Sequence, residues 1–140
     1  ARGDYETALT YLKQSLEVYR KLGHKEGEGA ALNNISQIYD ARGDYETALT
    51  YLKQSLEIQR EIGDVAGLCA TLFNMGHIHL QNEEVQEAVA CWVQVYLLAT
   101  KINLAQVLDA LENLAGQIGL EGGLQGWAKL AEQFADAEEP

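Results

Sequence analysis

The sequence predicts an all-α protein built as a solenoid of antiparallel helix pairs. The first seventeen residues, ARGDYETALTYLKQSLE, recur unchanged from Ala41, forty residues later. Apolar residues are spaced as on amphipathic helices, and the only proline is Pro140, so no proline interrupts a helix. A repeat of this length indicates units that pack one on the next.

Each block of forty residues predicts two helices. Leu32, Ile35 and Tyr39 form one apolar stripe. Gly43 can take the left-handed conformation that ends a helix, and Asp44 can cap the helix that follows. The same signals along the chain predict seven helices, over residues 4–22, 26–41, 44–62, 66–81, 84–101, 104–119 and 123–137.

The repeat favours stacking over a closed helical bundle, which needs no repeats in register. A helix pair alone cannot bury both its stripes, whereas stacked pairs cover one another. One repeat position always holds a small residue, which we expect to allow close helix approach, namely Ser36, Gly76 and Gly116.

We divide the chain as a single array. Residues 1–25 are expected to form the second helix of a truncated repeat, 26–65 and 66–103 two repeats, and 104–140 a degenerate capping repeat with Trp127 in its core. The first helix has an apolar face that expects a preceding helix, so we predict self-association there, through Tyr5, Leu9, Leu12 and Leu16.

Composition limits the partners. The net charge of −11 disfavours nucleic acid and anionic lipid and favours neutral or basic partners. No apolar stretch is long enough to cross a membrane. Cys69 and Cys91 lie among apolar residues, so we expect core thiols in a reducing cytoplasm.

No group of residues predicts catalysis. His77 and His79 are two residues apart, so they point to different sides of a helix and predict no metal site. His24 stands where Asp64 stands one repeat later and is expected in a surface loop. No nucleophile and base share a plausible site, so we expect no enzyme and no cofactor.

The order of residues within each block resembles the tetratricopeptide repeat. The second block carries this pattern in Leu32, Ile35-Ser36, Tyr39, Gly43-x-Tyr45 and Ala48. The forty-residue period resembles the repeats of kinesin light chains, Pins-type adaptors and many bacterial regulators. The resemblance implies a right-handed superhelical solenoid of about three and a half repeats that acts as a non-catalytic scaffold or adaptor.

The resemblance also implies where a peptide would bind, because first helices line the concave groove in this family. Their positions opposite the apolar stripe are rich in side-chain amides, which can bond an extended peptide. The candidate partner-binding residues are Asn33, Asn34, Gln37, Phe73, Asn74, His77, Asn113 and Gln117. Alternatively, Asn33, Asn34 and Asn74 bond one another or local backbone.

Two further expectations concern the ligand. Some relatives grip an acidic tail with lysine and arginine, but no such cation lies in the predicted groove, so an acidic tail is not expected. The alternative function is self-association, in which the open ends of the solenoid are the working surface.

Overall fold

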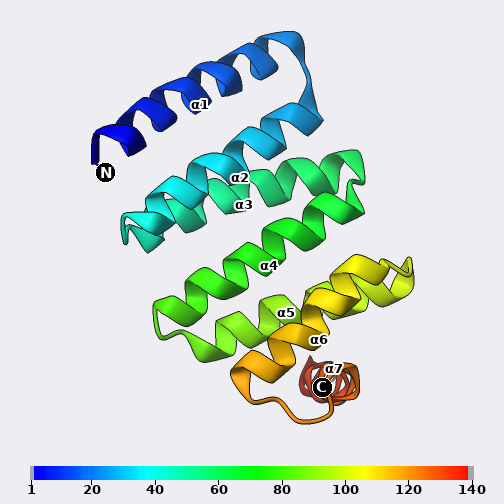
Figure 1. The fold of residues 1–140 in the computed structure, drawn as a ribbon. Helices are drawn as coiled ribbons and strands as arrows, with labels where there is room; N and C mark the ends of the chain where they lie inside the picture. The colour runs from blue at the N-terminus through cyan, green and yellow to red at the C-terminus, as the bar shows by residue number, and fades with distance from the viewer. Residues whose placement is uncertain (1, 139–140) are drawn as a thin grey trace.

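The computed structural model describes residues 2–138, which form a stack of antiparallel helices without a strand (Figure 1). All seven predicted helices are present, with ends within about two residues of those expected. They are α1 (Arg2–Leu22), α2 (Lys25–Ala41), α3 (Tyr45–Ile62), α4 (Val65–Gln81), α5 (Val85–Lys101), α6 (Ala105–Ile118) and α7 (Leu124–Glu138).

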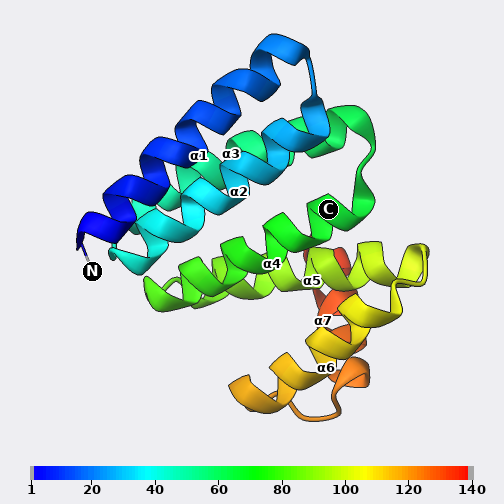
Figure 2. The ribbon, with the colours of Figure 1, turned by 45° about the horizontal axis from the view of Figure 1, so that its top comes forward.

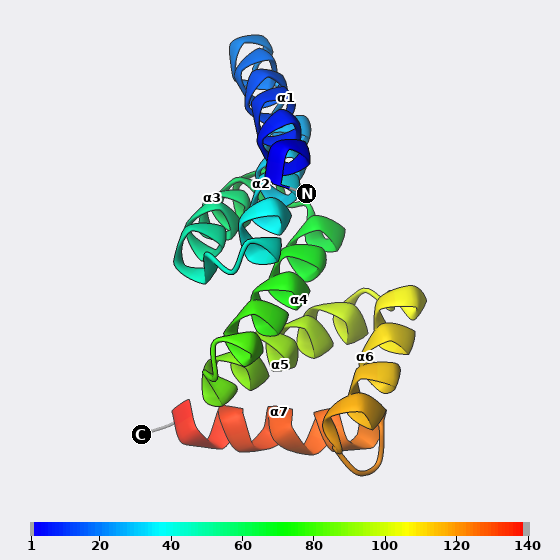
Figure 3. The same ribbon diagram turned by 60° about the vertical axis from the view of Figure 1, so that its left-hand side comes forward.

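The helices pack in chain order. The closest pairs are α2 with α3 and α4 with α5, and each pair also contacts its neighbours along the stack (Figure 2). The last helix, α7, packs on both α5 and α6 and lies across the end of the stack (Figure 3). The predicted all-α solenoid is therefore confirmed.

The helices end at a turn that recurs along the chain. Gly43 and Gly63 have positive φ of 78° and 68°, and the next amide bonds back to the helix, as from Asp64 to the Gln59 carbonyl at 2.9 Å. The same turn forms without glycine at Glu83 (φ 62°) and Asn103 (φ 56°).

Helix starts also follow the repeat. Asp64 accepts a hydrogen bond from the amide of Gly67 at 2.9 Å, which satisfies one free donor of α4. His24 does the same for α2, because its Nδ1 accepts from the amide of Gly27 at 2.9 Å. His24 is exposed and lies in the connection between α1 and α2, as expected, and from there it caps α2.

Close approach at the small repeat position is confirmed in part. Ser36 and Gly76 are buried, and the indole of Trp92 lies directly against Gly76. Gly116 is exposed, and a side chain there would meet nothing within 4 Å. The expectation was therefore wrong at Gly116, because no helix among residues 2–138 packs on that side of α6.

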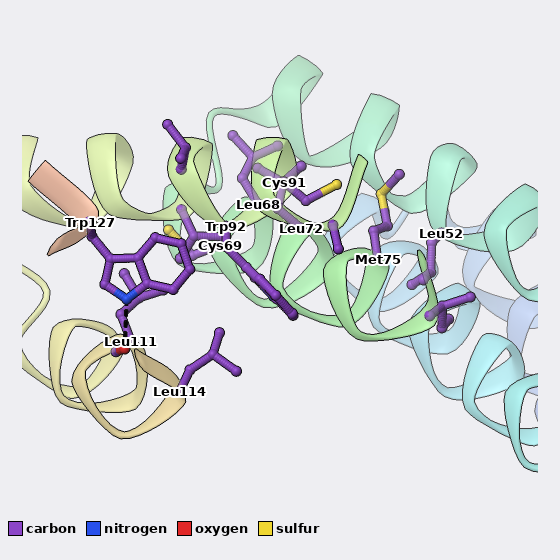
Figure 4. Packing of buried hydrophobic residues seen from close by; sticks show 14 of the residues in the cluster. Leu52, Leu68, Cys69, Leu72, Met75, Cys91, Trp92, Leu111, Leu114 and Trp127 are labelled. Carbon is purple, nitrogen blue, oxygen red and sulfur yellow. Dashed lines mark hydrogen bonds between the residues drawn. The ribbon is translucent and has the colours of Figure 1, made fainter. Parts of the chain in front are cut away.

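The core consists of two clusters of buried residues. The N-terminal cluster joins α1, α2 and α3 through Leu9, Leu16, Ala31, Leu32, Ile35 and Ile58. The main cluster runs from α3 to α7 and includes Leu52, Leu72, Trp92, Leu111 and Trp127 (Figure 4). Tyr39 packs against both clusters and so connects them.

Trp127 is a core residue, as expected. It is fully buried, and its Nε1 donates a hydrogen bond to the Leu111 carbonyl at 2.7 Å (Figure 4). Its ring meets Trp92 edge to face at 6.1 Å between centroids. These contacts anchor α7 to α5 and α6.

Candidate functional site

The predicted partner-binding residues lie on α2, α4 and α6, the first helices of the pairs. The structure divides them into two groups. Asn33 and Asn74 are half-buried and bond within the protein, whereas Asn34, Gln37, Asn113 and Gln117 are exposed.

Asn33 is the centre of a polar network beneath the groove. Its Nδ2 donates to the hydroxyl of Ser55 at 2.9 Å and to that of Thr71 at 2.8 Å. Its Oδ1 accepts from Asn74 Nδ2 at 3.3 Å. Thr71 in turn donates to Gln59 Oε1 at 2.6 Å. Asn33 therefore ties α2 to α3 and α4, and sequence reasoning missed the buried Ser55, Gln59 and Thr71, which the family pattern does not mark as polar.

The exposed amides have the opposite character. Asn34 and Gln37 of α2 make no side-chain hydrogen bond within residues 2–138, and neither do Asn113 and Gln117 of α6. Their donors and acceptors face solvent, where a ligand backbone could use them. The amides therefore fall under both interpretations. Asn33 and Asn74 bond within the protein, whereas the four exposed amides remain the candidates for binding a ligand in the groove.

Two pockets open between the first helices. The α2–α4 pocket has a volume of about 290 Å³ and is lined mostly by polar residues, among them Glu26 and Asp64. The α4–α6 pocket has a volume of about 280 Å³ and is mostly apolar, with Phe73, Val107 and Ala110 in its wall. Asn34 and Gln37 line the first pocket, and Ala70 and Asn74 line both.

An aromatic row supports the groove from below. The ring of Phe73 meets that of His77 at 4.9 Å between centroids, and His77 meets Trp92 at 5.3 Å. Trp92 Nε1 donates to the Phe73 carbonyl at 3.2 Å. Phe73 and His77 are consequently held in place by the core while both remain half-buried at the surface.

Asp40 of α2 and His77 of α4 are close enough to influence each other's charge. Burial lowers the pKa of His77 from its ordinary value of 6.5, and the charge of Asp40 opposes that shift. Burial also raises the pKa of Asp40 from its ordinary value of 3.8, and the charge of His77 opposes that rise. Asp40 Oδ1 is buried without a hydrogen-bond partner among the described residues, so its charge is poorly compensated.

The described residues contain no group of three or more histidine, cysteine or acidic side chains that could hold a metal. His79 is paired with Glu84, at 3.0 Å from Nδ1 to Oε1, and hydrogen bonds with His79 and Asn82 lower the pKa of Glu84.

Burial raises the pKa of the Cys91 thiol to about 11 and also raises the pKa of the Cys69 thiol. Neither thiol is a thiolate at neutral pH, so neither is an activated nucleophile.

The residues predicted for self-association are only partly open. Leu9 and Leu16 are buried by α2, so that part of the expectation needs correction, while Tyr5 and Leu12 are half-buried. The sequence pattern showed one apolar stripe, and that stripe faces α2 within the chain. The exposed apolar side chains of α1 are instead Tyr11, Val18 and Leu22.

None of the helices described is both long enough and apolar enough to span a bilayer.

No curated protein matches the sequence. Among solved structures, BtubC (BKLC) from P. vanneervenii is similar, with a TM-score of 0.69 and 16% identity. The similarity covers 96% of this chain and 58% of that chain, and at this identity it concerns the fold alone.

A family model described as tetratricopeptide repeat matches residues 1–61. This region contains α1, α2 and most of α3, with both copies of the repeated seventeen residues. The fold of the remaining helices continues the same stacking of pairs. The resemblance found in the sequence is thus confirmed: the chain has the fold of a tetratricopeptide solenoid, and the model of the tetratricopeptide repeat matches its residues 1–61.

Proposed function

We propose that this protein is a non-catalytic scaffold that binds an extended segment of a partner protein along α2, α4 and α6. Tetratricopeptide solenoids generally act as protein-interaction modules. The observation that carries the proposal here is the adjacency of the two pockets, one lined mostly by polar residues and one mostly apolar, which share Ala70 and Asn74.

The pockets suggest how the segment is held. An apolar side chain of the ligand would enter the α4–α6 pocket and contact Phe73 and Val107. The neighbouring ligand backbone would bond the exposed amides of Asn34 and Gln37 on one side and of Asn113 and Gln117 on the other. Asn33 and Asn74 would mainly fix the shape of the groove, because their own polar groups already bond within the protein.

The charge of the site favours a neutral or basic segment. Glu26 and Asp64 line the α2–α4 pocket, and Asp40 near His77 has an uncompensated buried oxygen. The whole chain has a net charge of −11, which attracts a basic ligand segment at long range and repels an acidic one. We propose a cytoplasmic location because Cys69 and Cys91 are buried, free thiols.

Self-association through the end of the stack is the second candidate. The observation that favours it is the exposure of Tyr11, Val18 and Leu22 on α1. The two candidates use different surfaces, so substitutions on α4 and on α1 separate them.

Peptide selection from a random library, followed by titration calorimetry of the selected peptide, tests the groove. Ala70→Glu should abolish binding, because Ala70 is exposed and its enlarged, charged side chain would project between the two pockets. Gln54→Glu is the matched control, since it adds the same side chain at an exposed position of α3. Equal binding by both variants would contradict the proposal.

A further inference from the structure

A separate pocket lies where α3, α4 and α5 meet, in the middle of the stack (Figure 1). It has a volume of about 260 Å³ and shares no lining residue with the two pockets of the groove. We call it the α3–α5 pocket. Its lining consists of Arg60 on α3, Leu68 and Leu72 on α4, and Gln94, Leu97 and Leu98 on α5.

The charge of Arg60 has no partner within the protein. Among the described residues that line the pocket, Arg60 alone is charged, and it is exposed. Its guanidinium forms no ion pair or hydrogen bond within residues 2–138, including with Glu57 and Glu61 of its own helix. The guanidinium is therefore available to a carboxylate from another molecule.

The repeat shows how an arginine at this position is used. Arg20 stands forty residues before Arg60, and its Nε lies 3.5 Å from Oε2 of Glu28 on α2. Glu28 is buried, and its counterpart in the α3–α5 pocket is Leu68, which is also buried. The arginine thus recurs in the second block while its carboxylate partner does not.

A second acidic position has also become apolar. Glu57 on α3 corresponds to Leu97 on α5, which is 51% exposed. Both replacements remove a negative charge and add apolar surface. The pocket consequently places one unpaired cation beside apolar walls, which is complementary to a ligand with one carboxylate and one apolar group.

The size of the pocket fits side chains of a longer ligand. Sites that enclose a whole small molecule usually have volumes of about 300–1,000 Å³, and the α3–α5 pocket is smaller. An apolar side chain would contact Leu72 and Leu98, and a neighbouring carboxylate would bond Arg60. The net charge of −11 opposes an acidic ligand at long range, so the apolar contact has to supply part of the affinity.

We propose that the α3–α5 pocket docks a segment of a partner protein that presents a leucine beside a glutamate or aspartate. The leucine enters the pocket, and the carboxylate binds Arg60 as Glu28 binds Arg20. This chemistry differs from that of the groove along α2, α4 and α6, for which we propose a neutral or basic segment. The two surfaces therefore accept different segments.

Acetyl-Leu-Glu-amide is the first probe, and acetyl-Leu-Gln-amide is its uncharged match. In an NMR titration of the full chain, the first should saturably shift the amide signals of Leu68, Leu72 and Leu98. The second should bind about threefold more weakly or worse, as expected for loss of an exposed charge pair. Arg60→Gln should bind both probes equally. Arg42→Gln should keep the preference, since Arg42 is an exposed arginine outside the pocket.

Three outcomes of this titration would overturn the proposal. They are an absence of shifts at the pocket, equal binding of the two probes by the unsubstituted chain, and a preference for the glutamate probe that survives Arg60→Gln. Octanoate tests a fatty acid as the occupant, because it carries a carboxylate and an alkyl chain without a peptide backbone. Tighter binding of octanoate than of acetyl-Leu-Glu-amide would overturn the assignment to a partner protein. Shifts of the pocket signals with protein concentration alone would do the same, because they would indicate a second copy of the chain.

A substitution that supplies a carboxylate from within the chain gives an independent test. Leu97→Glu restores the glutamate of the preceding block beside Arg60 and should weaken binding of acetyl-Leu-Glu-amide about threefold or more. Val85→Glu is the matched control, since Val85 on α5 is 56% exposed and lies outside the pocket. Equal binding by these two variants would contradict the proposal. None of the substituted residues lines the groove pockets, so each result leaves the proposed function to its own test.

Discussion

The indole of Trp92 fills the space into which a side chain at Gly76 would project. Forty residues earlier, the same two positions hold Ser36 and Leu52, both buried. A larger residue on the second helix of a pair is thus matched by a smaller one on the first. The total volume between the helices is kept while its division between them changes.

This compensation predicts coupling in a double-mutant cycle. Gly76→Ser should cost about 1–3 kcal/mol by overpacking, and Trp92→Leu on the order of 2 kcal/mol by leaving a cavity. The double variant restores the Ser36 and Leu52 combination, so it should lose at least 0.5 kcal/mol less than the sum, on the order of known couplings. Urea unfolding measures all four proteins, and strictly additive losses would contradict the interpretation.

Because the Asn33 amide bonds within the protein, we expect its removal to lower the stability of the fold as well as any binding. Asn33→Ala should cost about 1–3 kcal/mol, because Ser55 and Thr71 lose a shared donor and Asn74 loses its acceptor. Asn34→Ala on the adjacent exposed position should change stability by less than about 0.5 kcal/mol. The urea midpoints of the two variants give the comparison, and similar midpoints would mean that the network contributes little.

The electrostatic interaction between Asp40 and His77 predicts that stability depends on pH. Because burial lowers the pKa of His77 below 6.5, the folded state binds fewer protons there than the unfolded state, and stability falls as the pH drops through 6.5. Asp40 opposes that shift, so Asp40→Asn should lower the pKa of His77 further. The raised pKa of Asp40 also adds stability as the pH falls toward its ordinary 3.8, and the variant loses this gain.

Asp40→Asn should therefore lose more stability on acidification than the unsubstituted protein. NMR titration of the His77 imidazole checks the pKa, and thermal unfolding between neutral and mildly acidic pH checks the stability. Asp109→Asn is the control, since it removes the same charge from an exposed position on α6. A pKa of His77 that rises in Asp40→Asn would contradict the assigned electrostatics.

The turn at Glu83 predicts a stabilising substitution. Its φ of 62° lies in the left-handed region, where a non-glycine residue costs about 1 kcal/mol, and the equivalent positions in earlier turns are glycines. Glu83→Gly should therefore stabilise the protein by about 1 kcal/mol. Asn103→Gly should gain less, because asparagine tolerates this conformation. Thermal unfolding of both variants tests this, and a larger rise in melting temperature for Asn103→Gly than for Glu83→Gly would contradict it.

The fold was predictable because the signals are local and repeated. Gly43 and Asp44 mark a helix end and a helix start by backbone chemistry that needs no tertiary information. The burial of Trp127 followed from the amphipathic pattern of its helix. The open surroundings of Gly116 did not follow, because they depend on which side of α6 remains free of a neighbour.

The candidate site was predictable only in outline. Helical phase places Asn33 and Asn34 next to each other at the groove, but it cannot tell which of them finds partners. The hydroxyls of Ser55 and Thr71, on other helices, decide that Asn33 is internally bonded. In the same way, a stripe containing Leu9 and Leu16 shows that α1 is apolar on one side without showing that α2 already covers it.

The division of the core into two clusters has a consequence for how the molecule opens. In a linear stack, each element is stabilised mainly by its immediate neighbours, so cooperativity weakens wherever their shared contacts thin out. The two clusters are connected at Tyr39. We therefore expect the N-terminal cluster to unfold as a separate unit while α4 and α5 keep their amide protons protected from exchange, so that unfolding starts from the end at which α1 lies.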